Sequence, residues 1–249
     1  MGLNVGGGGG GLAQAAVHKQ ITRATEKGRG WMIPNNDYVG AATSMELGGL
    51  MNTAAFTDST GRNAMDEYGV YFEQDFSTVS GADQGWYEQV DKTRLDHKPF
   101  FSHTFLLPAA VTNLRMFVGL ADITALGDVS DADDFTVSGI GLQYSTGRAD
   151  TTFQFLEDDG TTQNITDSTV TVAANTLYTF EVDAASSTSV VVRIRNADGT
   201  VAASATLSTN LPGATVGLRP VFLINPQAAQ LHQLRNYKGA LETRAYGIA

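Results

Sequence analysis

The sequence contains no cysteine. This absence excludes disulfides, thiol catalysis and cysteine-ligated metal sites, so the stability of the chain has to come from burial and assembly. No apolar run approaches the roughly 20 residues of a membrane-spanning helix, and we expect no membrane insertion. The N-terminus also lacks the charged and then apolar order of a secretion signal. These absences predict a chain that is made and kept in the cytoplasm, or released only by lysis.

Charged residues are scarce, at 17% of the chain, and they carry a formal net charge of −10. An acidic protein repels the phosphates of nucleic acids, and we therefore expect no nucleic acid partner. The one basic cluster, Lys19, Arg23, Lys27 and Arg29, lies near the N-terminus. We interpret it as a solvated helix face or a contact with an acidic neighbouring subunit. Heptads, collagen-like triplets and internal repeats are absent, which argues against a long fibrous shaft.

Instead, 42% of the residues are hydrophobic, and the polarity comes mainly from Thr, Ser, Asn, Gln and Gly. This composition favours many short strands joined by turns. We predict strands where apolar and polar residues alternate, which is the pattern of a strand with one buried face. These segments are residues 67–76, 100–107, 114–120, 140–144, 152–156, 169–172, 178–183, 190–196, 202–209, 219–224, 230–237 and 243–246. Strands at this spacing without intervening helices predict an all-β fold, an antiparallel β-sandwich or barrel.

The N-terminal region has a different pattern. We predict a flexible arm in which the glycines from Gly6 to Gly11 form a continuous run, followed by a short helix from Leu12 to Lys27. Ile21 lies near the apolar face of that helix with Leu12, and Arg23 lies elsewhere. The helix serves either as an assembly anchor or as an ordinary cap. We therefore divide the chain into an attachment arm at residues 1–30, an irregular connection at 31–64 and a β-sandwich domain at 65–249.

An ordered set of motifs then resembles a known family. It runs from Arg115-Met-Phe-Val-Gly-Leu120 through Gly139-Ile-Gly-Leu142, Thr152-Phe-Gln154, Asp158-Asp-Gly160 and Thr209-Asn-Leu-Pro212 to Leu241-Glu-Thr-Arg-Ala-Tyr246. This set resembles the concanavalin-like jelly-roll domains that are common in structural proteins of tailed bacteriophages, such as tail fibres and capsid decorations. The resemblance covers about residues 65–246. It implies a β-sandwich jelly roll in a virion component, assembled as a homotrimer or another homo-oligomer.

The same fold also carries glycan hydrolases and lectins, so the fold alone does not decide the function. In the laminarinase-like hydrolases, catalytic carboxylates lie on one strand as Glu-x-Asp-x-x-Glu, and here the matching segment is Glu181-Val-Asp183-Ala-Ala-Ser186. Ser186 stands where the proton donor belongs, which argues against glycan hydrolysis. Arg193 and Arg195 lie on one face of a neighbouring strand, which is either the solvent side or a ligand-binding surface.

Two further groups of residues offer speculative binding sites. Asp128, Asp131, Asp133 and Asp134 form an acidic loop that could bind calcium, although a solvated loop explains it better. Trp86 and Tyr87 follow two nearby glycines and could stack on a sugar if they are exposed, while core or interface packing is the simpler explanation.

No nucleophile triad, phosphate-binding loop or dinucleotide motif is present, and we expect no cofactor. The sequence thus predicts a non-enzymatic virion structural protein, a capsid decoration or short tail fibre, that is assembled in the host cytoplasm. It would dock on other virion proteins through its N-terminal arm. The alternatives are a lectin-like module for a host-surface glycan and, less favoured, a glycoside hydrolase.

Overall fold

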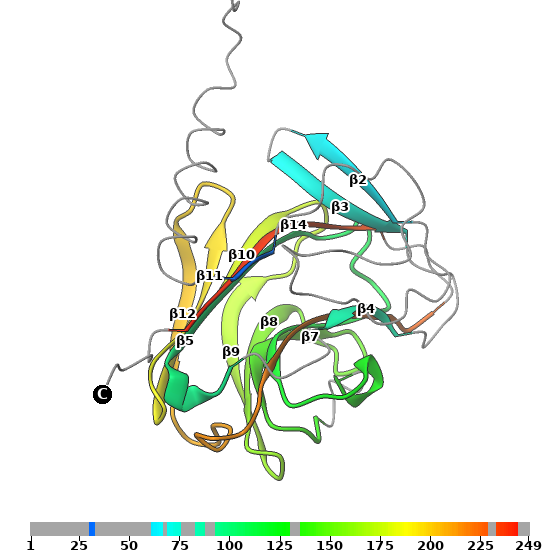
Figure 1. Cartoon of the computed structure of the whole chain (residues 1–249). Coiled ribbons are helices and arrows are strands. Elements are labelled where there is room, and N and C mark those ends of the chain that lie inside the picture. Colours follow the sequence, from blue (N-terminus) through cyan, green and yellow to red (C-terminus); the bar gives the residue numbers. More distant parts are fainter. Residues whose placement is uncertain are drawn as a thin grey trace, which may run out of the picture.

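The computed structural model describes residues 30–32, 61–66, 69–75, 83–87, 93–129, 135–228 and 233–243. In these residues the chain forms two antiparallel sheets (Figure 1). One is an eight-stranded sheet made of β12 (Val201–Leu207), β11 (Ser189–Asn196), β10 (Leu177–Ser186), β5 (Pro99–Leu106), β14 (Gln233–Thr243), β3 (Gly69–Asp75) and β2 (Gly61–Asp66), with β1 (Gly30–Met32) paired to β14. The other is a six-stranded sheet made of β4 (Gln84–Tyr87), β13 (Arg219–Pro226), β6 (Leu114–Ala121), β7 (Gly139–Ser145), β8 (Thr152–Asp158) and β9 (Gln163–Thr171). Short 3-10 helices are η1 (Leu95–His97) and η2 (Leu126–Val129).

The main core lies between the two sheets and confirms the predicted antiparallel β-sandwich. Phe101 and Phe105 of β5 and Phe180 of β10 contribute from the eight-stranded sheet. Met116 and Phe222 contribute from the six-stranded sheet, and all five side chains have at most 1% of their surface exposed. Burial of this apolar surface from both sheets is the main source of stability, since the chain has no disulfide.

Most predicted strands are confirmed to within one or two residues, and the differences have physical reasons. Strand β9 begins at Gln163, whereas the alternation predicts a start at residue 169. Its first half is polar because β9 is an edge strand with many exposed residues, so no apolar period marks it. Strand β14 continues to Thr243 through an irregularity at residues 236–238, where the sequence predicts a break. Strands β1 and β2 lie almost wholly within the region predicted as irregular, and both belong to the eight-stranded sheet.

A second apolar cluster covers part of the outer face of the six-stranded sheet. It combines Phe117 of β6 and Leu223 of β13 with Ile123 and Phe135 from the connection between β6 and β7. The rings of Phe117 and Phe135 lie 5.0 Å apart. A Cβ atom on Gly141 would overlap the Phe117 ring, and one on Gly139 would lie 2.9 Å from the Phe135 ring. The glycines of β7 therefore make room for aromatic rings that lie against the sheet.

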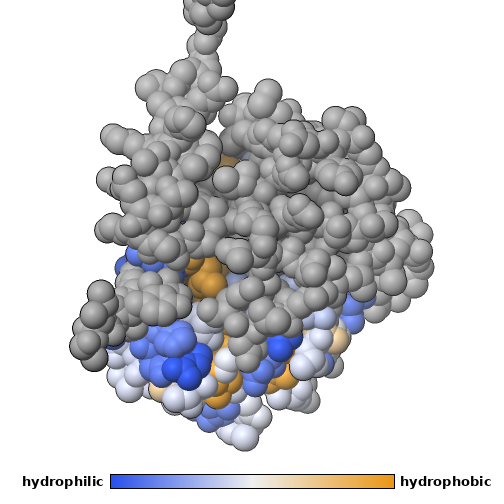
Figure 2. All heavy atoms as spheres, in the orientation of Figure 1, coloured by the Kyte–Doolittle hydropathy of each residue, from blue (hydrophilic) through white to orange (hydrophobic). Residues whose placement is uncertain are grey.

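Figure 2 shows the surface in the same orientation as Figure 1. Among the described residues that are visible on this face, hydrophilic residues alternate with smaller hydrophobic patches. Within the part of the chain that the structure describes, no helix is long and apolar enough to cross a membrane.

Candidate functional site

Polar side chains gather at one end of the outer face of the six-stranded sheet. The alternation along each strand decides this placement, because Met116, Val118, Leu142 and Tyr144 point into the core and their neighbours point outward. The outward residues are Asp83, which precedes β4, Asn225 of β13, Arg115 of β6, Gln143 and Ser145 of β7, Thr152 and Gln154 of β8, and Asp167 of β9. We call these residues, together with Arg148 and Asp150 of the β7–β8 turn, the polar band.

The strand register places the members of the band beside one another. Asn225 pairs with Arg115, and Arg115 pairs with Ser145. One row further along the strands, Gln143 pairs with Gln154, and Gln154 pairs with Asp167. On the other side of this second row, Gln143 pairs with Phe117 of the apolar cluster. The outer face therefore changes from polar to apolar at Gln143.

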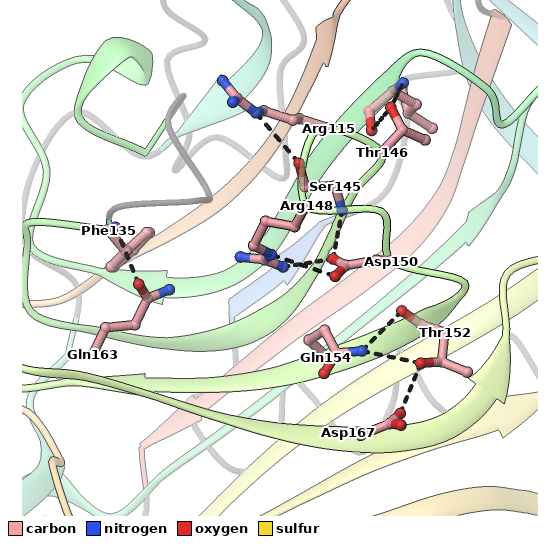
Figure 3. A network of polar contacts seen from close by, with 11 residues as sticks. Arg115, Phe135, Ser145, Thr146, Arg148, Asp150, Thr152, Gln154, Gln163 and Asp167 are labelled. Atoms are coloured by element: carbon pink, nitrogen blue, oxygen red, sulfur yellow. Dashed lines mark hydrogen bonds and ion pairs between the residues drawn. The ribbon is translucent and has the colours of Figure 1, made fainter.

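Side-chain hydrogen bonds connect most of the band, and Figure 3 shows those of β6 to β9. The Arg115 Nε donates to the Ser145 Oγ at 3.4 Å. The Arg148 guanidinium donates to Asp150 at 2.6 Å, and the Ser145 backbone N–H donates to the same carboxylate at 2.9 Å. The Asn225 amide donates to Asp83 at 2.7 Å. Most of the charges and dipoles in the band are thus held in place by their neighbours.

The neighbouring strands carry a second chain of bonds. The Gln154 Nε2 donates to the Thr152 Oγ1 at 3.0 Å, and that hydroxyl donates to Asp167 at 2.7 Å. Hydrogen bonds from the Thr169 backbone N–H and the Thr152 hydroxyl lower the pKa of Asp167 below its usual value. The carboxylate therefore stays ionised and accepts these bonds throughout the neutral range.

Gln143 is the exception within the band. Its side chain has no exposed surface, and both its Oε1 and its Nε2 lack a hydrogen-bond partner among the described residues. A buried amide without partners is costly, and nearly all such groups in folded proteins are paired. The sequence shows Gln143 as the one polar side chain between Ile140 and Tyr144, but strand periodicity gives no sign that its amide is unpaired.

The carboxylates that the sequence compares with a hydrolase site lie elsewhere, on the outer face of the eight-stranded sheet. Glu181 accepts a hydrogen bond from the Arg195 Nε at 2.7 Å. The Arg193 guanidinium lies 3.4 Å from Asp183 and 3.8 Å from Glu181. Strands β10 and β11 pair Glu181 with Arg193, so the sheet register itself creates this ladder of ion pairs. The two arginines bind carboxylates of their own chain.

The structure places Trp86 in core packing, which the sequence favours over the speculative sugar stacking. Trp86 is fully buried in the main core, where its ring contacts His103 and Phe222 and its Nε1 donates to the Asn236 Oδ1 at 3.4 Å. A ring enclosed in the core between the two sheets cannot stack on a ligand. Tyr87 points to the opposite face, is 9% exposed in the second apolar cluster, and donates its hydroxyl hydrogen to the Thr124 carbonyl at 2.8 Å.

Asp128 is the one member of the predicted calcium loop that the structure describes. Its Oδ2 accepts hydrogen bonds from the backbone N–H groups of Thr124 and Ala125 at 2.7 and 3.0 Å. Partial burial raises the pKa of Asp128, but other effects outweigh it. The two backbone bonds, a further hydrogen bond from the Thr124 hydroxyl and the positive charge of Arg219 together lower this pKa below its usual value. The residues with described positions contain no group of three or more metal-binding side chains.

The remaining predicted site residues lie outside the described residues. Asp131, Asp133 and Asp134 belong to this set, so the calcium site stays a prediction. The assembly arm with Gly6, Gly11, Leu12, Ile21 and Arg23 also lies outside. Its helix and its attachment role stay predictions as well.

A sequence comparison decides the family of the chain. Residues 66–229 match the family described as SO2946-like, C-terminal domain. The chain belongs to this family. No curated protein sequence matches it at a significant level.

Solved structures agree with this assignment. The SO2946-like chain superposes on the crystal structure of SO2946 from Shewanella oneidensis MR-1, a protein of unknown function, with a TM-score of 0.66 over 97% of both chains at 11% identity. It also superposes on the exoplasmic/lumenal domain of VIP36 in a form bound to Ca²⁺ and Man3GlcNAc, with a TM-score of 0.53, 12% identity and coverage of 86% and 88%. Lectin II from Ulex europaeus is similar at a TM-score of 0.47, with 13% identity and coverage of 74% and 91%. The likenesses to SO2946 and VIP36 show that this SO2946-like protein has a β-sandwich jelly-roll fold.

Proposed function

We propose that this protein is a non-enzymatic structural protein displayed on the surface of a bacteriophage particle, as a capsid decoration or a short tail fibre. The observation that carries the non-enzymatic part is the pairing of Glu181 and Asp183 with Arg195 and Arg193. The phage part is supported by the ordered motif set between residues 115 and 246, which resembles the jelly-roll domains of tailed-phage virion proteins.

A glycosidase of this fold needs a free nucleophile and a nearby proton donor. Here Glu181 is bound by an arginine at 2.7 Å, and Ser186 occupies the position of the donor. We expect no release of reducing sugar from bacterial polysaccharides by the wild-type protein or by Glu181→Gln. Sugar release that disappears in Glu181→Gln would contradict the proposal and identify a hydrolase.

The proposed attachment is tested by deleting residues 2–27. The deletion removes none of the described residues that form the main core, and we expect a folded sandwich that no longer joins particles. Incorporation at wild-type occupancy would show that the arm does not attach the protein. Light scattering of the full chain would test the expected homo-oligomer, for which a monomer at working concentration is the contrary result.

A lectin-like module for a host-surface glycan is the second candidate, and two observations favour it. The VIP36 domain with the same fold is known in a form bound to Man3GlcNAc. The outer face of the six-stranded sheet also carries the polar band, which contains the unpaired amide of Gln143. The candidate predicts that fluorescently labelled protein binds host cells. No binding at high micromolar protein would contradict it. Display on a particle and glycan binding are compatible functions.

A further inference from the structure

We propose that the polar band is the binding site of a neutral oligosaccharide, with Gln143 as its central hydrogen-bonding residue. This inference rests on the second candidate function, glycan binding. It adds the location of the site, the residue on which affinity depends and the charge class of the sugar.

Gln143 supplies the first argument. Its amide offers two donors and one acceptor, and no described protein group meets either end although the side chain is fully buried. Other buried side chains of the band are paired: Ser145 meets Arg115, and Asn225 meets Asp83. A sugar hydroxyl can donate and accept at once, and two adjacent hydroxyls match the adjacent donor and acceptor of an amide. Gln143 is therefore placed to bind such a pair.

The position of Gln143 supports this role. It lies between the apolar Phe117 on β6 and the half-buried Gln154 on β8. A sugar ring has an apolar face and a polar rim, so a surface where apolar and polar residues meet suits it better than either alone. Gln143 is covered in the structure, so the proposal requires side chains beside it, such as Gln154 on the paired strand, to change rotamer when a ligand binds.

Charge decides in favour of a neutral sugar. The band contains two cations, Arg115 and Arg148, and three anions, Asp83, Asp150 and Asp167, which gives 2 − 3 = −1. Arg148 is bound to Asp150 at 2.6 Å. The whole chain has a formal net charge of −10. An acidic sugar would be repelled at long range and would find one arginine already engaged by a carboxylate.

The extent of the band favours an oligosaccharide over a single sugar. The row from Asp83 to Thr152 crosses β13, β6 and β7. With neighbouring strands about 4.8 Å apart, the row is about 19 Å long. This length suits several linked sugar units that lie across the strands. Thr152, at one end of the row, is half-buried, and its neighbour Thr151 is exposed, so a longer chain can leave the site there.

The test uses the full-length protein on an array of short neutral bacterial oligosaccharides beside alginate and polygalacturonate fragments. The best binder is then titrated against variants by calorimetry. We expect wild-type binding to a neutral member, and a loss of about tenfold or more in affinity for Gln143→Met, which keeps the length of the side chain and removes its amide. Gln154→Ala should weaken the same binding. Gln163→Met, a change on the same sheet but outside the band, is the matched control and should leave the affinity unchanged.

A fold readout separates binding from stability. The melting temperature of unliganded Gln143→Met should equal or exceed that of the wild type, because the change removes an unpaired buried amide. Wild-type affinity in both Gln143→Met and Gln154→Ala would overturn the site and leave glycan binding standing. Preference for alginate or polygalacturonate would overturn the neutral class. An array without any wild-type binding at high micromolar protein would overturn glycan binding and the site together, and leave the display proposal untouched.

Discussion

At the scale of single residues, His103 is the titratable group with the most unusual surroundings. It lies 1% exposed between the sheets, with the rings of Trp86, Phe105 and Phe222 around it. Its Nε2 is 3.0 Å from the Asn236 Oδ1. Burial lowers the pKa of His103 from 6.5 to about 4, although the bond to Asn236 acts in the opposite direction. The imidazole is therefore neutral at neutral pH.

This shift predicts a loss of stability in mild acid. The unfolded chain takes up a proton on this histidine below about pH 6.5, and the folded chain does so only near pH 4. Stability is fully present above pH 6.5 and falls as the pH drops through this window, by roughly 3 kcal/mol in total. Urea titrations between pH 7 and pH 4 would measure it. The substitution His103→Phe leaves the hydrogen bond from Trp86 to Asn236 in place. Between pH 7 and pH 4, the free energy of unfolding of this variant should fall by roughly 3 kcal/mol less than that of the wild type. An equal fall in both proteins would contradict a buried neutral histidine.

At the scale of elements, β6 and β7 approach closely because of the glycines between them. A Cβ atom on Gly119 would overlap the carbonyl oxygen of Ile140 on the paired strand. Backbone atoms cannot move aside as the end of a flexible side chain can, so the two strands would have to separate. The same strands carry Arg115, Gln143 and Ser145, and the spacing of the polar band depends on this contact.

We expect Gly119→Ala to destabilise the protein by about 3 kcal/mol, the upper end of what overpacking usually costs. Chemical denaturation would give the value. Gly127→Ala is the control, because among the described residues its Cβ would meet only the Asp83 carboxylate, at an ordinary 3.5 Å. A Gly119→Ala protein as stable as the control would show that the sheet absorbs the extra atom.

The ion pairs between β10 and β11 should contribute much less. Arg195 is 31% exposed and Glu181 is 12% exposed, so water and salt screen their attraction. We predict that Arg195→Met costs about 0.5–1 kcal/mol at low salt and less at 1 M salt. A double-mutant cycle with Glu181→Gln would isolate the pair. A coupling above about 3 kcal/mol, typical of a fully buried pair, would refute this description.

At the scale of the whole molecule, one core joins the two sheets. Phe222 of the six-stranded sheet lies 5.7 Å from the ring of Phe105, which belongs to the eight-stranded sheet. The Phe222 side chain is fully buried. Neither sheet can bury its inner face without the other, so we expect them to unfold together.

Phe222→Ala should therefore lower the free energy of unfolding by about 3–5 kcal/mol and keep a single transition. Tryptophan fluorescence, which includes the buried Trp86, and far-UV circular dichroism should give the same midpoint. Two separate midpoints in the variant would mean that the sheets are independently stable.

The sequence by itself determined the all-β class, most strand positions and the weakness of the hydrolase motif. Strand alternation is a local property of the sequence, and it can be recognised wherever one face of a strand is buried. The prediction from alternation failed for the first half of β9, whose polar edge residues have no apolar period. The sequence also did not decide whether Trp86 is buried or exposed, because Gly85 resembled a turn residue. Gly85 is instead a strand residue with a φ of +149°, whose missing side chain allows close contact with the Phe222 backbone.

Only the tertiary structure decided which side chains meet. Gln143, Gln154 and Asp167 lie in three strands, and the register of β7, β8 and β9 brings them into one row. The same is true of Glu181 and Arg195, which are separated along the chain and bound across β10 and β11. Pairing between strands depends on turns, on irregularities and on which face is buried, and the composition of any single strand does not record it. A polar residue can therefore be found from the sequence, but whether its hydrogen bonds are met depends on its neighbours in space.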